Sequence, residues 1–429
     1  MNITWIESTE TRTWLKRSAT VEPPGESNLA LGDETGERWR GFGCCFNELG
    51  WLALRDLPAE QRRAVLECLF APRGCALSIG RIPVGASDYA AEWYSCNEHE
   101  GDFAMRRFSI QRDRKCLLEY LKEALAIRPE LSFFCSPWSP PTWMKQPRAH
   151  NFGRFIMEPE YLDAYALYFL KFVKAYAAEG VHISQVHPQN EPAADQKFPS
   201  CLWSGEQLRI FIRDHLGPLF ARKAPRTKIW LGTMNTADYA GMFLPVLLDD
   251  DARRYVHGIG LQWDGKAVVR KCRRAWPGLE VMQTENECGD GRNTWDYAHY
   301  VFSLFQHYMA NGASAYVYWN AILPPGGMST WGWRQNAMIT VDPATRDVTF
   351  NPEFFVMKHF SHFVQPGAAR LELEGPWSGN AVAFKSGRAV TAVIANPMHE
   401  THELVLRAGS KTVHATMQPR SFNTLKLAL

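Results

Sequence analysis

The segment EYLDAYALYFLKFVKAYAAEGVHISQVHPQNEP, residues 160–192, contains a predicted helix, a predicted strand and a polar turn, in that order. Aromatic residues recur through its first part at steps of four, three, four and four, which places one face of a helix at Tyr161, Tyr165, Tyr168, Phe172 and Tyr176. Gly180 predicts the end of this helix, because glycine readily adopts the backbone conformation of a C-terminal cap. Residues 183–189 are then a candidate strand, and Asn190 and Glu191 follow it directly.

The same unit of strand and helix recurs along residues 40–365. Short apolar runs predict eight strands, at 41–46, 76–85, 131–136, 183–189, 229–234, 256–263, 280–285 and 315–319. Helical periodicity follows each of them, at 59–70, 111–127, 160–179, 206–223, 239–250, 266–275, 295–311 and 353–362. Eight strands that are each followed by a helix indicate an α/β fold of the (β/α)8, or TIM barrel, class.

The sequence pattern changes at both ends of this region. After residue 366, leucines alternate with other residues at period two, as at 404 and 406 and again at 425, 427 and 429, with turn signals between the runs. The first 38 residues are also strand-like. We therefore predict a catalytic barrel over residues 39–365 and a small antiparallel β-sandwich side domain that residues 1–38 and 366–429 build together.

Composition and charge exclude several classes of function. The chain of 429 residues is 46% apolar and 21% charged, which is ordinary for a folded globular protein. A net charge of +2 gives no broad attraction to nucleic acid. No apolar run reaches the roughly 18–20 residues that a membrane span needs. The 13 histidines and 10 cysteines show neither paired metal-ligand spacing nor a CxxC motif, so we expect no metal and no cofactor.

The first 16 residues lack the continuous apolar stretch of a secretory signal peptide. Ten cysteines are too sparse in this chain for a disulfide scaffold, and buried reduced thiols are the simpler interpretation. We therefore expect a cytoplasmic protein, or a secreted one if a leader has been removed. The oligomeric state does not follow from these features.

Two carboxylates stand at the ends of the fourth and seventh predicted strands. Glu191 follows the fourth strand within the stretch HPQNEP, and Glu285 ends the seventh within QTENECG. Active sites of TIM barrels form at the C-terminal ends of the strands. These two ends lie across the barrel mouth from each other, so the two carboxyl groups could flank one glycosidic bond. A helix cap or an ion pair is the alternative role for either residue.

The motifs around these residues resemble those of glycoside hydrolase family 30, which includes the glucosylceramidases. The match covers most of the chain, and its most specific part is the third-strand stretch SPWSPPTWMK, residues 136–145. Other matching stretches are GFG at 41–43, ELGW at 48–51, SIGRIPV at 78–84, SDY at 87–89, NEP at 190–192, TE at 284–285 and YWN at 318–320. The resemblance implies a (β/α)8 barrel with an attached β-sandwich, as the strand pattern does.

The resemblance also implies roles for individual residues. Glu191 would be the general acid/base and Glu285 the nucleophile of a retaining mechanism. Sugar binding would fall to four residues around this pair: Asn190 on the 2-hydroxyl, Asp88 and Trp143 on other hydroxyls, and Trp319 as an apolar platform under the ring.

The sequence departs from the glucosylceramidase pattern at two strand ends. At the sixth strand, glucosylceramidases read His-Trp-Tyr where this chain reads Gln262-Trp263-Asp264, so the tyrosine that usually contacts the nucleophile is replaced. We expect Trp263 and Asp264 to bind substrate, and we expect Asp264 to hydrogen-bond to a different sugar hydroxyl. At the seventh strand, period two places Glu287 on the same face as Glu285, which makes Glu287 a rival nucleophile.

These features predict a retaining β-glycosidase that resembles glucosylceramidases and β-glucosidases and acts on a carbohydrate. The mechanism predicts two carboxyl groups about 5–5.5 Å apart, against about 6.5–9.5 Å for an inverting enzyme. It also predicts that ionised Glu285 raises the pKa of Glu191. Alternatives within the family are an endo- or exo-acting β-1,6-galactanase or β-1,6-glucanase and a β-xylosidase. Alternatives outside it are a non-catalytic carbohydrate-binding protein and a barrel enzyme of unrelated chemistry, such as a lyase.

Overall fold

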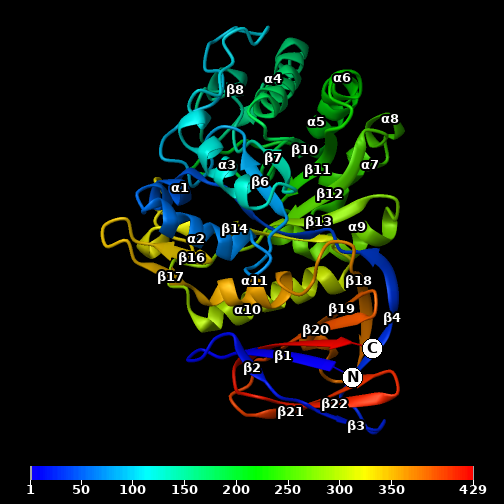
Figure 1. Cartoon of the computed structure of the whole chain (residues 1–429). Helices are drawn as coiled ribbons and strands as arrows, with labels where there is room; N and C mark the ends of the chain where they lie inside the picture. The colour runs from blue at the N-terminus through cyan, green and yellow to red at the C-terminus, as the bar shows by residue number, and fades with distance from the viewer. Residues whose placement is uncertain (1, 429) are drawn as a thin grey trace.

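A closed barrel of eight parallel strands forms the centre of the computed structural model, which describes residues 2–428 (Figure 1). In chain order the strands are β5 (Gly41–Cys45), β6 (Ile79–Pro83), β7 (Ser132–Ser136), β10 (Ile183–Val186), β11 (Lys228–Met234), β12 (Val256–Gln262), β13 (Glu280–Glu285) and β14 (Ala315–Asn320). Each strand pairs with the next one along the chain, and β14 closes the barrel on β5. The predicted TIM barrel is therefore confirmed.

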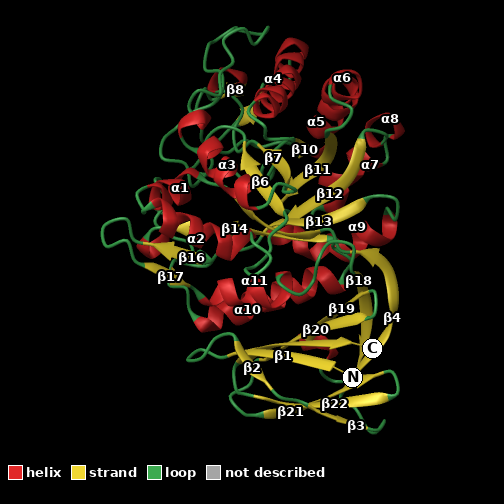
Figure 2. Ribbon diagram, viewed as in Figure 1, coloured by secondary structure: helices red, strands yellow, loops and turns green. Residues whose placement is uncertain are grey.

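Helices cover the outside of the barrel (Figure 2). They are α1 (Glu48–Arg55), α2 (Ala59–Phe70), α3 (Leu117–Ile127), α4 (Pro159–Ala178), α5 (Gly205–Ile210), α6 (Gly217–Lys223), α7 (Leu244–Leu247), α8 (Asp250–Arg253), α9 (Val269–Ala275), α10 (Trp295–Ala310) and α11 (Pro352–Ser361). Small sheets lie in the loops: β8 (Lys145–Gln146) with β9 (Arg154–Phe155), and β15 (Ile322–Leu323) with β16 (Ile339–Val341) and β17 (Val348–Phe350).

Two predicted helices differ in detail from the observed ones. The segment 206–223 is divided by a π-helical turn at Phe211–Leu216, and the segment 239–250 begins with another at Tyr239–Phe243. Each turn is followed within two residues by a proline, Pro218 or Pro245. Proline lacks the N–H that a regular helix needs and its ring crowds the carbonyl four residues earlier, so a wider turn accommodates it.

The unit at residues 160–192 contains the predicted helix, and its strand begins as predicted but ends at Val186, three residues before the predicted end. Helix α4 buries its aromatic face, and Gly180 follows its end with a φ of +85°. Strand β10 then enters the barrel with three of its four residues buried. Beneath the mouth, side chains from the strands fill the barrel interior as a packed cluster of Ile79, Phe134, Trp230, Met282, Ala315 and Val317. The polar residues at the strand ends thus lie above a packed layer of apolar side chains.

A second, ten-stranded sheet lies beside the barrel (Figure 1). Its strands are β1 (Asn2–Ser8), β2 (Leu15–Arg17), β3 (Thr20–Glu22), β4 (Leu29–Arg38), β18 (Ala369–Glu374), β19 (Ala381–Ser386), β20 (Ala389–Asn396), β21 (His402–Ala408), β22 (Lys411–Met417) and β23 (Ser421–Ala428). They pair in the order β2-β1-β23-β20-β19-β18-β4-β21-β22-β3, so strands from both chain ends share one sheet. Side chains from both halves of the sheet, among them Trp5, Leu404 and Leu425, form one enclosed core. No helix within residues 2–428 is long and apolar enough to cross a membrane.

Helix α11 joins the barrel to this sheet through one buried histidine. Nδ1 of His359 lies 2.8 Å from Thr424 Oγ1 on β23, and Nε2 lies 2.9 Å from Ser8 Oγ on β1. Burial lowers the pKa of His359 to about 3, so the imidazole is neutral at pH 7. A neutral imidazole offers one donor and one acceptor, which the two hydroxyl groups can match.

Replacing His359 by leucine should weaken this junction. The substitution leaves the hydroxyl groups of Ser8 and Thr424 buried without these partners, and each such loss costs about 1–3 kcal/mol. We expect the free energy of unfolding, measured with urea, to fall by about 2–4 kcal/mol. The exposed His399 serves as the control, because H399L removes no buried contact. Equal stability of the two variants would show that the histidine does not hold the junction.

Candidate active site

Glu191 stands at the end of a segment that follows β10 and runs beside β11. Its amide donates to the Thr233 carbonyl at 3.0 Å, and the Thr233 amide donates to the Gln189 carbonyl at 2.7 Å. The φ of Glu191 is +49°, a left-handed conformation that is uncommon for residues with a side chain. The paired backbone holds the residue in this conformation, and such strained positions cluster at functional sites.

The side-chain amide of Gln262, at the end of β12, links the two carboxyl groups. Its Nε2 donates to Oε1 of Glu191 and to Oε2 of Glu285, at 3.1 Å in both cases. These two oxygens are therefore no farther apart than twice 3.1 Å. Oε1 of Gln262 accepts from Thr284 Oγ1 at 2.8 Å, which fixes the orientation of the amide.

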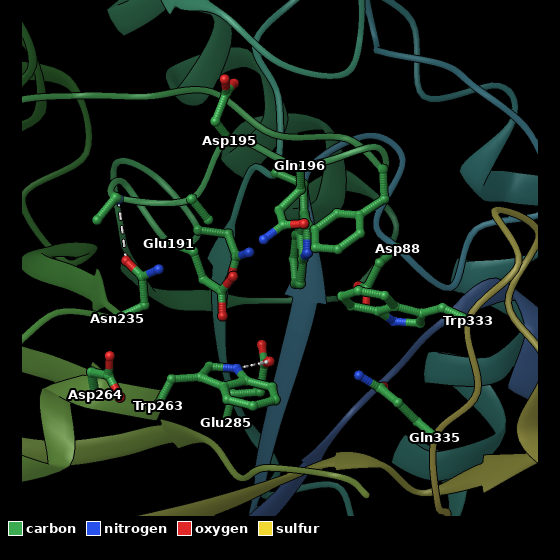
Figure 3. A pocket seen from close by; sticks show the side chains of 15 residues that line it. Asp88, Glu191, Asp195, Gln196, Asn235, Trp263, Asp264, Glu285, Trp333 and Gln335 are labelled. Atoms are coloured by element: carbon green, nitrogen blue, oxygen red, sulfur yellow. Dashed lines mark hydrogen bonds between the residues drawn. The ribbon is translucent and has the colours of Figure 1, made fainter. Parts of the chain in front are cut away.

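Three donors surround the carboxylate of Glu285, which is almost fully buried. Nη1 of Arg81 donates to Oε2 at 2.6 Å and forms an ion pair inside the barrel. Nε1 of Trp263 donates to Oε1 at 3.1 Å (Figure 3), and Gln262 completes the set. These contacts compensate the negative charge of Glu285. Gln262 and Trp263 thereby supply contacts to Glu285 in a chain that lacks the tyrosine of the glucosylceramidase pattern.

The carboxyl group of Glu191 is in a different electrostatic setting. Burial and, second, the negative charge of Glu285 raise the pKa of Glu191 to about 8, although the residue keeps part of its surface open to the pocket. The charge of Glu285 acts in the direction predicted from the sequence, and burial adds a larger effect that the sequence did not reveal. Glu191 therefore carries a proton at neutral pH.

Asp88 contributes a third carboxyl group to the same pocket. It is 5% exposed, and its Oδ1 accepts no hydrogen bond from any described residue. Burial and then the charges of Glu285 and Glu191 raise the pKa of Asp88 well above its ordinary value. A buried carboxyl oxygen without a partner is costly, and a hydroxyl group of a ligand would satisfy it.

The side-chain oxygen of Asn190 accepts hydrogen bonds from the protein, which leaves the side-chain NH2 group to donate to a ligand. Oδ1 accepts from Arg81 Nη2 at 2.6 Å and from Thr233 Oγ1 at 3.1 Å. Asn190 also lines the pocket between the two carboxyl groups. Its Nδ2 is therefore the group that can donate to a ligand hydroxyl beside them.

The pocket between these groups has a volume of about 310 Å³. That is near the lower limit of the roughly 300–1,000 Å³ typical of ligand sites. Its polar wall consists of Asp88, Asn190, Glu191, Asp195, Gln196, Asn235, Asp264, Glu285 and Gln335 (Figure 3). Its apolar wall consists of Trp138, Ala193, Ala194, Phe198, Trp263 and Trp333. Many hydrogen-bonding groups beside a few flat rings suit a compact ligand rich in hydroxyl groups.

Six of the eight residues named from the sequence line this pocket, and Trp143 and Trp319 do not. After β7 the chain turns outward, so the Trp143 indole donates to the Asn97 carbonyl at 2.9 Å and packs on Tyr161. Trp319 is fully buried behind Trp138, with ring centroids 5.1 Å apart. Trp138, five residues before Trp143 in the same motif, is the indole that reaches the cavity.

Glu287 lies away from the pocket. Strand β13 ends at Glu285, so period two does not continue to residue 287. The Glu287 carboxylate instead pairs with Lys266 at 2.5 Å and accepts from the Tyr300 hydroxyl at 2.6 Å. The geometric argument for Glu287 as a rival nucleophile therefore fails.

Sequence reasoning missed several pocket residues that come from loops, among them Gln196, Asn235 and Gln335. Gln335 is the best defined of them, because its Oε1 accepts from Asn320 Nδ2 at 2.8 Å, and Asn320 Oδ1 in turn accepts from Asn47 Nδ2 at 3.0 Å. This chain of amides leaves the Gln335 Nε2 as a donor at the pocket. Asn320 belongs to the YWN motif, but nothing in the sequence joins it to a residue fifteen positions later.

Comparison with known proteins identifies similar sequences and folds. A model of the glycosyl hydrolase family 30 TIM-barrel domain matches residues 39–364. The chain is 27% identical over 414 residues to the lysosomal acid glucosylceramidase of Mus musculus. This alignment covers 89% of this chain and 77% of that protein. The chain is 26% identical over 374 residues to an endo-1,6-beta-D-glucanase of Neurospora crassa, covering 82% and 76%. Among solved structures, SrfJ from Salmonella typhimurium has a TM-score of 0.91 at 21% identity over 100% of both chains, which shows a shared fold.

Replacing Arg81 by methionine should destabilise the site strongly. The variant leaves the buried carboxylate of Glu285 without its cation, and an uncompensated buried charge costs about 3–5 kcal/mol. We expect a loss of that size in the free energy of unfolding, measured with guanidinium chloride. The control is R38M, because Arg38 forms an exposed pair with Glu34 that contributes about 0–1 kcal/mol. A loss below about 1 kcal/mol in R81M would contradict the charge balance described here.

Proposed function

This chain belongs to glycosyl hydrolase family 30 and is a glycoside hydrolase, and from that premise we propose that it cleaves β-glucosidic bonds with retention of configuration. In this proposal Glu285 is the nucleophile and Glu191 the general acid/base. The bridging amide of Gln262 is the observation that carries the proposal, because it fixes how far apart the two carboxyl groups can be.

The separation of the carboxyl groups supports retention. An inverting enzyme places a water molecule between its two carboxyl groups and needs about 6.5–9.5 Å between them. Nε2 of Gln262 lies 3.1 Å from one oxygen of each residue, so these nearest two oxygens are at most twice 3.1 Å apart. This short approach supports the closer spacing of a retaining pair, in which Glu285 attacks directly.

The proposed reaction has two steps. Glu285 attacks the anomeric carbon, and protonated Glu191 gives its proton to the departing glycosidic oxygen, which leaves a glucosyl ester on Glu285. Glu191, now a carboxylate, takes a proton from water, and the water oxygen attacks the anomeric carbon and releases Glu285. The raised pKa of Glu191 suits its first role, and the donors around Glu285 suit its return as a leaving carboxylate.

Glucose is the sugar to which the names of both relatives refer, the lysosomal acid glucosylceramidase and the endo-1,6-beta-D-glucanase, and we propose it for the bond that this enzyme cleaves. The pocket walls favour a hydrophilic leaving group over a lipid. Asn235 and Asp264 lie on the Glu191 side of the pocket, and no Leu, Ile, Val or Met side chain lines it within the described residues. A ceramide chain would need such apolar surface, so we propose a carbohydrate leaving group.

A reducing compartment such as the cytoplasm is our proposal for the location. All ten cysteines are free, and nine of them are buried. Burial raises the pKa of the Cys44 and Cys135 thiols, among others, which keeps them protonated and unreactive. These features support a protein that functions without disulfides.

Azide should distinguish the two carboxylates by the product it forms. In Glu191→Ala, the glucosyl ester on Glu285 still forms, and azide attacks it to give β-glucosyl azide. In Glu285→Ala, azide attacks the substrate directly from the opposite face and gives the α-azide. Without azide, each variant should lose about 10²–10⁴-fold or more in kcat on an unactivated β-glucoside. The matched control is E287A, which should retain activity because Glu287 is outside the pocket.

The proposal fails if azide gives the α-product with the Glu191 variant, or if E287A is as inactive as E285A. The two azides differ in the NMR coupling of the anomeric proton, so the assignment does not depend on rates.

Activity should decline at alkaline pH. Glu191 must be protonated to release the leaving group, and its pKa of about 8 lies above the ordinary value for glutamate. We expect kcat/KM for an unactivated β-glucoside to fall tenfold per pH unit above about pH 8, because this parameter reports the free enzyme. A constant kcat/KM from pH 7 to pH 10 would contradict the assignment of Glu191.

A further inference from the structure

Large exposed apolar side chains gather at the barrel mouth. Within residues 2–428 eight such side chains are exposed, and three of them, Trp93, Phe152 and Met328, belong to loops at the C-terminal ends of barrel strands. Trp93 is 40% exposed and is the only tryptophan of the eight. Flat indole faces at the mouth of a glycosidase cleft are suited to the C–H faces of sugar rings.

Trp93 packs with two other aromatic side chains in a group that we call the outer platform: Trp93, His150 and Trp331. The Trp93 and Trp331 rings have centroids 4.6 Å apart, and the His150 ring lies nearly parallel to Trp93 at 5.7 Å. Trp93 comes from the loop after β6, His150 from the loop after β7 and Trp331 from the loop after β14. Aromatic residues from three loops thus converge on one place.

Buried hydrogen bonds hold the outer platform in position. Tyr89, four residues before Trp93, donates from its hydroxyl to the Gly327 carbonyl at 2.8 Å, and Thr330 donates to the Ala90 carbonyl at 2.6 Å. The fully buried Lys145 donates to the His150 carbonyl at 3.0 Å. These bonds join the loops to one another, so the platform is pre-organised for a ligand.

The outer platform and the wall of the catalytic pocket share one loop. Trp331 and Trp333 belong to one hairpin, in which the Trp333 carbonyl accepts from the Ser329 amide at 2.7 Å. Trp333 lines the pocket beside Gln335, and Phe198 packs edge-on against it with centroids 4.9 Å apart. One hairpin therefore carries both a ring of the pocket, Trp333, and a ring of the outer platform, Trp331, two residues apart.

The position of Trp333 indicates which part of a substrate would follow this surface. Figure 3 shows Trp333, Gln335 and Asp88 on one side of Glu285, and Asn235 and Asp264 on the other. The leaving group departs next to its proton donor, Glu191. The cleaved glucose then occupies the side of Asp88 and Gln335, and further sugars attached to it extend past Trp333.

We propose that the outer platform is a carbohydrate subsite that binds glucose residues on the non-reducing side of the cleaved bond. The inference rests on the proposed function and adds that the substrate is an oligosaccharide or polysaccharide cut within its chain. Extension of the chain past Trp333 onto Trp93 would bury aromatic surface against sugar rings, and that binding would favour endo-acting hydrolysis.

A length series tests the subsite. The substrates are 4-methylumbelliferyl glycosides of one, two and three β-1,6-linked glucose residues, and the measurement is kcat/KM. For the wild type we expect kcat/KM to rise with length. In Trp93→Ala the ratio of kcat/KM for three residues to that for one should fall about tenfold, as the loss of one aromatic stack of about 1.4 kcal/mol predicts. W93F should restore most of the ratio.

The control variant is M398A, because Met398 has a similar exposure, 38%, in the turn between β20 and β21 of the side sheet, far in sequence from the barrel loops. Its ratio should equal that of the wild type. An unchanged ratio in W93A, with normal hydrolysis by the wild type, would overturn the subsite and leave the proposed function intact. Failure of the wild type to hydrolyse any of the three glycosides would overturn both.

A lipid surface is the competing occupant of an exposed aromatic patch. Hydrolysis of glucosylceramide in phosphatidylcholine vesicles is measured with the same variants. If W93A lowers that rate while its ratio in the soluble length series equals the wild-type ratio, the platform binds a membrane surface and the proposed subsite is wrong.

Discussion

The guanidinium group of Arg81 lies inside the barrel, without exposure to solvent, and joins the ends of several strands. It donates to Glu285 on β13, to Asn190 after β10 and to Ser136 on β7. Trp138 and Trp319 lie within 4.5 and 5.5 Å of it, measured from the guanidinium carbon to each ring centroid. One buried cation therefore sets the position of the proposed nucleophile, of the Asn190 side-chain amide and of two indoles. Isolated charge is costly in such a place, so the arrangement persists only when its partners are present.

The same cation determines how protons are distributed over the pocket. Three carboxyl groups, of Asp88, Glu191 and Glu285, lie close together, and Arg81 contacts only one of them directly. Burial raises the pKa of Asp88 and of Glu191, and the charge of Glu285 raises both further. One compensated carboxylate beside a protonated carboxyl group is the combination that nucleophilic attack and proton donation require in one step. The chemistry thus follows from unequal surroundings of chemically similar groups.

The barrel could be predicted from local periodicity, because each strand is a short buried run and each helix has one apolar face, as residues 160–192 illustrate. Glu191 and Glu285 could be predicted because strand ends in a parallel barrel meet at one face. The family resemblance implied sugar binding by Trp143, but Trp138 is the indole that lines the pocket. The two residues are five positions apart in one motif, and which of them faces the cavity depends on how the chain turns after β7. Glu287 was predicted to share a face with Glu285 because side chains alternate at period two along a strand, but the strand ends at Glu285. Gln335 and Asn235 could not be predicted, because they come from loops whose path depends on contacts far apart in sequence.

The most direct test of this account is to trap the covalent intermediate. The protein would be incubated with 2,4-dinitrophenyl 2-deoxy-2-fluoro-β-glucoside, and the labelled peptide would be sequenced by tandem mass spectrometry. The account predicts one fluoroglucosyl group per chain, attached to Glu285, with no label in the Glu285→Gln variant. A label on Glu287 or Asp88 would contradict the assignment of the nucleophile. Hydrolysis of an ordinary β-glucoside to the α-anomer as the first product, without any trapped enzyme, would contradict the retaining mechanism itself.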